Sequence, residues 1–114
     1  MTAQDFRRIA LGFPASSEGA HMGHPDFRVC KKIFATLDYP EKGWGMVKLT
    51  PQQQQVFVQA APEVFVPVKG GWGRQGATNV RLKTARKTSL CRAMATAWLR
   101  AAPKRLREEF KGIG

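Results

Sequence analysis

The sequence predicts a two-layer α+β domain, in which an antiparallel sheet carries its helices packed on one face. Short stretches of alternating apolar residues follow one another with connections of hairpin length, which is typical of antiparallel strands. Segments with apolar residues at helical spacing lie at both ends of the chain and in its middle. At 114 residues the chain has the length of a single domain. We therefore expect one domain over 1–114, with a basic C-terminal tail at about 104–114.

The first element predicted is a helix over residues 2–12. Thr2 is a suitable N-cap, and Asp5 places a negative charge in the first turn. Apolar side chains then recur one turn apart, and Gly12 followed by Pro14 ends the pattern.

The next stretch, 15–26, is small and polar, and predicts either a loop or a short edge strand. Alternation predicts strands at 27–30 and 33–37. Between them, Lys31 and Lys32 form either a tight turn or the continuation of a single strand; the pattern leaves both open.

A turn is predicted at 39–43 from its proline and glycine, and a strand at 44–49. Thr50 and Pro51 then form a helix start, with a hydroxyl cap before a proline at the first helical position. The helix is expected to end before Pro62.

The strand predicted at 64–68 contains Pro67, which favours an edge strand or a bulge. The glycine-rich segment 70–76 that follows predicts a flexible, hairpin-like loop around Trp72. Residues 78–83 alternate cleanly, so Val80 and Leu82 face the core. The opposite face of that strand then carries Asn79, Arg81 and Lys83.

The last helix is predicted to begin at a cap formed by Thr88 or Ser89. Its buried stripe falls at helical spacing and consists of Leu90, Met94, Ala97, Trp98 and Ala101. Arg92 and Arg100 lie off that stripe.

The positive charge is concentrated late in the chain. The net charge is +11, and residues 71–114 hold eleven of the basic side chains but only two acids, Glu108 and Glu109. Such an excess favours polyanions as partners. A solvated helix face with a basic tail, or an amphipathic helix on a membrane surface, are the alternatives. Neither a membrane span nor an apolar signal-peptide core is present in the sequence, so we expect a soluble cytoplasmic protein without a membrane role.

Residue types that carry catalysis or bind metals are sparse. His21, His24 and Cys30 lack a strong further ligand unless Asp26 joins them, and Cys91 is distant in sequence. The acids are scattered, and the glycine-rich segment lacks the pattern of a phosphate-binding loop. We expect no catalytic residue, no metal site, no cofactor and no enzyme activity, and two reduced, semi-buried cysteines.

A nucleic-acid surface is better supported by the residue types. Phosphates are contacted by cations held at intervals, and a tryptophan can stack on a base or enter a minor groove. It can equally cover the end of a sheet. The candidate contact residues are Trp72, Arg74, Arg81, Lys83, Arg86, Lys87 and Arg92.

Several short blocks in this order resemble the MmcQ/YjbR family of small bacterial proteins. The blocks span about residues 3–106 and are GHPDFRV at 23–29, KIFA at 32–35, APEVF at 61–65, WG at 72–73 with NVRL at 79–82, and AW at 97–98 with APKRL at 102–106. The resemblance implies a compact α+β fold of the kind called CyaY-like or secretion-chaperone-like. It also implies DNA binding through a double-wing arrangement, and no catalytic or cofactor residues. The extra glycines at 70–76 depart from the family pattern.

From these observations we expect a non-enzymatic module that binds DNA largely independently of sequence. The segment 70–76 and the turn at 39–45 would be the two wings that grip duplex phosphates. The alternative is a protein-interaction or homodimerisation module that uses the open sheet face, with Phe34, Phe65 and Trp72 as its apolar patch.

Overall fold

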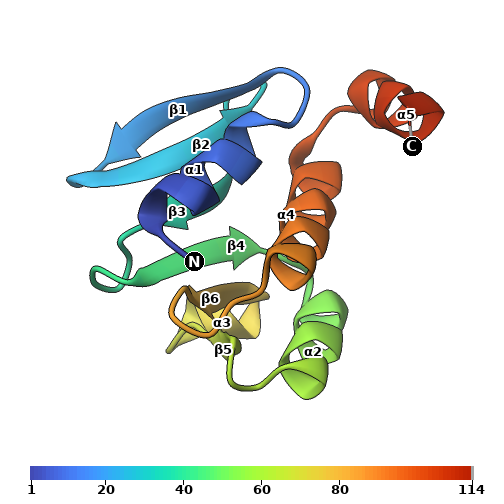
Figure 1. Cartoon of the computed structure of the whole chain (residues 1–114). Coiled ribbons are helices and arrows are strands. Elements are labelled where there is room, and N and C mark those ends of the chain that lie inside the picture. Colours follow the sequence, from blue (N-terminus) through green and yellow to red (C-terminus); the bar gives the residue numbers. More distant parts are fainter. Residues whose placement is uncertain (114) are drawn as a thin grey trace.

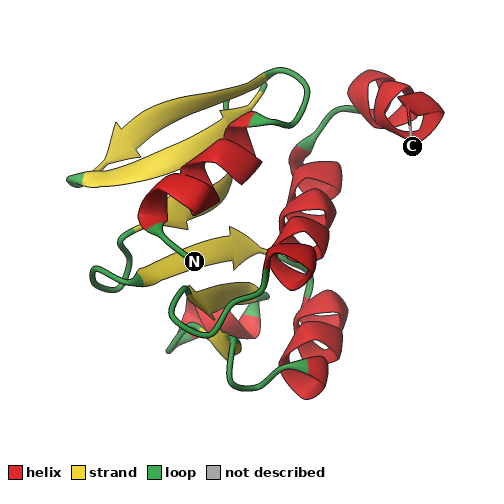
Figure 2. Cartoon of the chain, in the orientation of Figure 1, coloured by secondary structure: helices red, strands yellow, loops and turns green. Residues whose placement is uncertain are grey.

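The computed structural model describes residues 1–113, and side-chain surroundings for residues 1–110. It contains a six-stranded sheet in the order β1-β2-β3-β4-β6-β5, in which every neighbouring pair is antiparallel. Figure 1 shows α1 and α4 against one face of the sheet, and Figure 2 distinguishes the helices from the strands by colour. The predicted two-layer α+β architecture is confirmed. The strands are β1 (Ser16–His21), β2 (His24–Val29), β3 (Lys32–Leu37), β4 (Trp44–Lys48), β5 (Phe65–Pro67) and β6 (Ala77–Arg81). The helices are α1 (Ala3–Leu11), α2 (Pro51–Ala60), α3 (Gly71–Arg74), α4 (Lys87–Ala101) and α5 (Lys104–Ile113).

Helices α1 and α2 begin at the predicted caps. The Thr2 hydroxyl accepts from the backbone N–H of Asp5, and the Asp5 carboxylate accepts from the backbone N–H of Thr2 at 2.8 Å. Thr50 and Gln53 form the same reciprocal pair at the start of α2, which has Pro51 in its first turn. Each pair satisfies backbone donors that a helix start leaves free.

The two hairpins at the start of the sheet settle the alternatives left open by the sequence. Residues 16–21 are an edge strand, and β2 begins at His24, three residues earlier than the alternating pattern predicted. Met22 and Gly23 turn the chain with φ of 51° and 81°. Cys30 and Lys31 form the next tight turn with φ of 49° and 70°, so Lys32 already belongs to β3. Positive φ at both central residues matches the twist of a two-residue hairpin.

The core lies between the sheet and the helices. Trp98, Phe6, Phe27, Phe34 and Phe65 are its largest fully buried side chains. The predicted stripe of α4 is buried as expected. The strand containing the proline, β5, lies at the edge of the sheet, as predicted.

The glycine-rich segment is a short helix, which corrects the prediction of a flexible loop. A Cβ on Gly73 would lie 1.6 Å from the Val68 carbonyl oxygen, and one on Gly76 would lie 2.0 Å from that of Leu49. Gly76 also has φ +110°. These glycines therefore permit close backbone packing, and the packing holds α3 in place.

The C-terminal part differs from the prediction in its boundaries. Helix α4 starts after Arg86, and neither Thr88 nor Ser89 caps it, because both already lie within its first turn. The predicted basic tail is helical over α5: Leu106 is buried and the ring of Phe110 lies 5.1 Å from that of Trp98. None of the described helices is long and apolar enough to cross a membrane.

Candidate binding site on the open face of the sheet

The sheet has a second face, opposite the one on which α1 and α4 pack. The strand register shows which side chains lie on it. Ala35, Val47 and Thr78 are aligned across β3, β4 and β6 and point to the core. One position along, Thr36, Met46 and Asn79 are aligned in the same way, and so point to the other side. We call this second side the open face.

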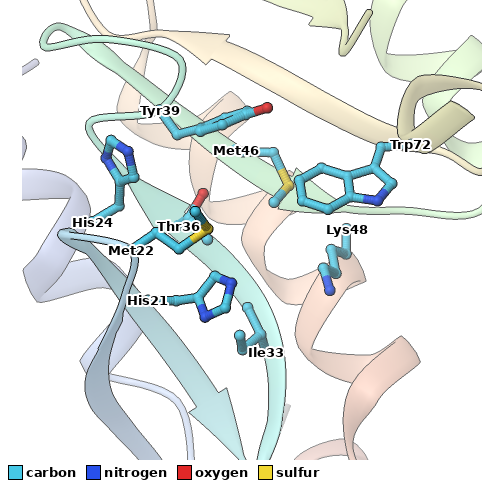
Figure 3. A pocket seen from close by; sticks show the side chains of 9 residues that line it. All are labelled: His21, Met22, His24, Ile33, Thr36, Tyr39, Met46, Lys48 and Trp72. Atoms are coloured by element: carbon cyan, nitrogen blue, oxygen red, sulfur yellow. The ribbon is translucent and has the colours of Figure 1, made fainter. Parts of the chain in front are cut away.

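A pocket of about 340 Å³ lies on the open face, where Figure 3 shows its side chains arranged around a common centre. Its volume is at the lower end of the range for small-molecule sites. The lining is contributed by the β1–β2 hairpin, strands β3 and β4, the loop after β3, and α3. The lining residues are His21, Met22, His24, Ile33, Thr36, Tyr39, Met46, Lys48 and Trp72. We call it the aromatic pocket.

Aromatic and apolar side chains form most of this pocket. The Tyr39 ring lies 5.8 Å from that of His24 and 6.2 Å from that of Trp72. Beneath them, Met46 belongs to a second apolar cluster, separate from the main core, against which Tyr39 packs. Trp72 is 57% exposed and Met22 is 84% exposed, so the rim presents apolar surface to solvent.

Two buried polar atoms on the open face have no hydrogen-bond partner among the described residues. They are the Thr36 hydroxyl oxygen and the Asn79 side-chain carbonyl oxygen. Thr36 lines the aromatic pocket, and both residues flank Met46 in the register. Native proteins leave few such atoms unsatisfied, so a ligand that supplies a partner would gain from the contact.

The position of Trp72 is set by the packing of α3. The Gln54 side-chain N–H₂ group on α2 donates to the carbonyls of Gly73 at 3.0 Å and Ala77 at 2.9 Å. Together with the close approach of Gly73 to Val68, these bonds hold the backbone of α3 beside β6. Trp72 is therefore presented on the open face by a fixed element.

A basic groove adjoins the aromatic pocket. It has a volume of about 570 Å³ and is lined by Lys31, Lys32, Ile33, Lys48, Arg100 and Ala101. Its cations come from the β2–β3 turn, the end of β4 and the last turn of α4, where the helix dipole favours positive charge. Among residues 1–110, no acidic side chain lines the groove. The ion pairs found within residues 1–110 are Arg7–Glu18, Arg8–Asp5 and Arg28–Asp26, and none involves a groove cation.

The pocket and the groove form one surface. A smaller cavity between them is lined by Met46, Lys48, Trp72 and Arg100, among others. Lys48 lines all of these hollows. Apolar rings and a cluster of unpaired cations therefore meet at this lysine.

The residues proposed from the sequence are not all on this surface. Trp72 lines the pocket. Arg81 lies on the open face with its guanidinium 4.5 Å from the ring of Trp44. Lys87 lies on the helix side, in a groove with Asp5 and Arg8 of α1, so it and Arg81 face in different directions. The remaining candidates are exposed on separate elements: Arg74 on α3, Lys83 after β6, Arg86 before α4 and Arg92 on α4.

The groove cations were not recognised from the sequence. Lys48 alternates with the core residue Val47, which is a local signal for the open face. Lys31, Lys32 and Arg100 carry no comparable signal, because only the fold brings the β2–β3 turn next to the end of α4.

Within the part of the chain that the structure describes, no cluster of His, Cys, Asp and Glu could hold a metal ion. Asp26 is fully buried and accepts two hydrogen bonds from Arg28, at 2.8 and 3.0 Å, which raise the pKa of Arg28. Cys91 is half-buried as expected, whereas Cys30 is exposed because it lies in the β2–β3 turn.

The apolar patch expected for a protein partner is not formed as predicted. Phe34 and Phe65 are buried in the main core, beneath the helices. Phe34 lies where the pairing of β2 and β3 shifts register, so it departs from simple alternation. Of the three residues proposed for that patch, Trp72 alone is exposed on the open face.

Comparisons with known proteins agree with this fold. A sequence model of the YjbR family matches residues 11–100. The crystal structure of a Deinococcus radiodurans protein with a DUF419 domain superposes with a TM-score of 0.73 at 20% identity, covering 96% of this chain and 88% of that chain. No curated protein matches the sequence.

Proposed function

Because the chain belongs to the YjbR family, and because a groove beside its open face holds cations that have no acidic partner among the described residues, we propose that it is a non-enzymatic DNA-binding module. The phosphate backbone lies in the basic groove and is contacted by Lys31, Lys32, Lys48 and Arg100. The observation that carries the proposal is that these cations, from three separate segments, converge on a groove in which the described residues place no acidic side chain.

The electrostatics of the groove favour a polyanion. Like charges held together repel one another, and an anion that enters the groove relieves that repulsion while releasing its own counterions. Three of the four groove cations are lysines, which act as point charges on phosphate and lack the bidentate fork of arginine. Binding through this groove is therefore expected to depend weakly on sequence.

The alternative is a protein partner or a second copy of the chain on the same face. The exposed side chains of Trp72 and Met22 favour it. Two copies related by a two-fold axis through this face would, however, bring their basic grooves towards each other. Charge complementarity therefore favours DNA over self-association.

The experiment is a titration of a fluorescently labelled random-sequence DNA, followed by anisotropy across a series of salt concentrations. With four phosphate contacts to duplex DNA, log K falls with log salt at a slope of about −3 to −4. Affinity that does not depend on salt, or a salt-resistant dimer that binds no DNA, would contradict the proposal and support the alternative.

A matched pair of variants locates the contact. Lys31→Ala/Lys32→Ala removes two charges from the groove, and is expected to make the slope shallower by about 2. Lys83→Ala/Lys87→Ala removes the same charge from exposed positions outside the groove, and is expected to leave the slope unchanged. Equal effects of both variants would mean that net charge, and not the groove, drives binding.

A further inference from the structure

Building on the proposed function, we propose that the aromatic pocket holds one unpaired nucleobase of the bound DNA, so that a single strand is preferred over a duplex. The phosphates of that strand continue into the basic groove. The basic groove alone would accept any polyanion. The aromatic pocket adds a site for a base and so identifies single-stranded DNA as the ligand.

The chemistry of the pocket matches a base attached to a phosphate. A nucleobase has two apolar faces and a polar edge. Tyr39, Trp72 and Met46 provide the apolar and aromatic surface on which such a ring packs. Trp72 is more than half exposed and is held in place by α3, so a stacked base would cover it without rearrangement of the backbone.

The polar edge of a base also finds a partner. Thr36 lines the pocket, and its buried hydroxyl oxygen has no hydrogen-bond partner among the described residues. A hydroxyl both donates and accepts, so it can bond to any base edge. Rotation of the Thr36 side chain towards the pocket would give this buried oxygen a partner, and the contact would not require one particular base.

Charge complementarity places the phosphate. Lys48 lines the aromatic pocket, the basic groove and the cavity between them. A phosphate attached to a nucleoside in the pocket would therefore meet Lys48, and the following phosphates would meet Lys31, Lys32 and Arg100. An apolar protein segment would leave these cations unpaired.

A duplex cannot use the pocket in this way. Its bases are stacked and paired, and a base must leave the stack before a protein pocket can enclose it. A single strand exposes its bases already and avoids that cost. The pocket thus predicts a preference for single strands that phosphate contacts alone would not produce.

The test compares two single strands that carry the same phosphates, one with bases and one without, and a duplex of the same length. Anisotropy is measured with a twelve-nucleotide single strand, the same strand with abasic sites throughout, and the corresponding duplex. We expect the normal strand to bind about tenfold or more tighter than the abasic strand and the duplex. Equal, salt-dependent affinity for all three probes would overturn the pocket assignment and leave the proposed function standing. The absence of any binding would overturn both.

Variants separate the pocket from the groove. Trp72→Ala is expected to reduce affinity for the normal strand to that for the abasic strand, and to leave abasic binding unchanged. Val56→Ala, at an apolar residue of α2 that is 65% exposed, is the control and is expected to change neither. If Trp72→Ala weakens both probes equally, the pocket does not hold a base.

A base attached to a phosphate can come from a DNA strand or from a free nucleotide, and a competition experiment distinguishes these two ligands. Adenosine monophosphate is expected to compete with the strand only at concentrations far above the strand's Kd, because it offers a single phosphate. If adenosine monophosphate competes at concentrations close to the Kd of the strand, the assignment to single-stranded DNA is overturned. The site would then be one for free nucleotides.

Discussion

Gln54 and Gly73 are joined by a hydrogen bond of 3.0 Å between the side-chain amide of α2 and the main-chain carbonyl of α3. The same amide donates to the carbonyl of Ala77 at 2.9 Å. One side chain thus connects α2, α3 and β6, and fixes the element that presents Trp72 on the open face.

Gln54→Ala is expected to destabilise the fold by about 1–2 kcal/mol, because it removes both donors and leaves a part-buried amide site empty. Binding of single-stranded DNA is expected to weaken as well, since α3 loses its support. Chemical denaturation and anisotropy measure the two effects. Gln55→Ala, at an exposed position on the same helix, is the control and is expected to change neither.

Gly73→Ala is expected to destabilise the protein by about 3 kcal/mol or to prevent folding, because the added Cβ would overlap the Val68 carbonyl oxygen. Gly71→Ala is the matched control on the same helix. Its Cβ would lie 3.7 Å from the nearest atom, the Arg74 guanidinium nitrogen, and is expected to change stability by less than about 0.5 kcal/mol. Thermal unfolding distinguishes the two, and a tolerated Gly73→Ala would mean that the segment is as flexible as its composition suggests.

That segment also shows what the sequence could and could not predict. The stripe on α4 and the caps at Thr2 and Thr50 were predictable, because each depends on residues within a few positions of one another. The close approach of Gly73 to Val68 depends on a tertiary contact, and glycine composition alone suggests mobility instead.

The same distinction applies to strands and to the site. The start of β2 at His24 depends on its pairing with β1, and the polar residues there show no alternation. The basic groove brings Lys31 and Lys32 next to Arg100, which is distant from them in sequence. No local sequence pattern could therefore predict the groove. The sequence shows that the excess positive charge lies in the C-terminal part of the chain. The groove cations, in contrast, come from both the N-terminal and the C-terminal half.

The N-terminal cap makes part of the stability dependent on pH. The backbone N–H of Thr2 holds the pKa of the Asp5 carboxyl below its ordinary value of about 4. A lowered pKa in the folded state stabilises the fold above the ordinary value, and that contribution is lost as the pH falls through the folded pKa. We expect the free energy of unfolding to depend less on pH in Asp5→Asn than in the unchanged protein between about pH 5 and pH 3.

Urea denaturation at several pH values measures this difference. Glu108→Gln, at an exposed position of α5, is the control and is expected to leave the pH profile unchanged. Identical profiles for Asp5→Asn and the unchanged protein would contradict a role of the cap in acid stability.

Lys48 is expected to have opposite effects on binding and on stability. It is half-buried among other cations, and within the described residues it has no acidic partner. Lys48→Met keeps the apolar stem but removes the charge, which relieves repulsion from Lys31, Lys32 and Arg100. Thermal stability is therefore expected to stay equal or rise.

Affinity for DNA is expected to fall about tenfold in Lys48→Met, because the lost charge is the one shared by the pocket and the groove. Lys42→Met, at an exposed lysine of the β3–β4 loop that lines neither hollow, removes the same charge and is expected to reduce affinity far less. Anisotropy and thermal unfolding on the same preparations measure both properties. If Lys48→Met binds DNA as tightly as the unchanged chain, the groove is not the DNA-binding site. A gain in stability together with a loss of binding is the pattern expected of a ligand site built from cations that lack acidic partners.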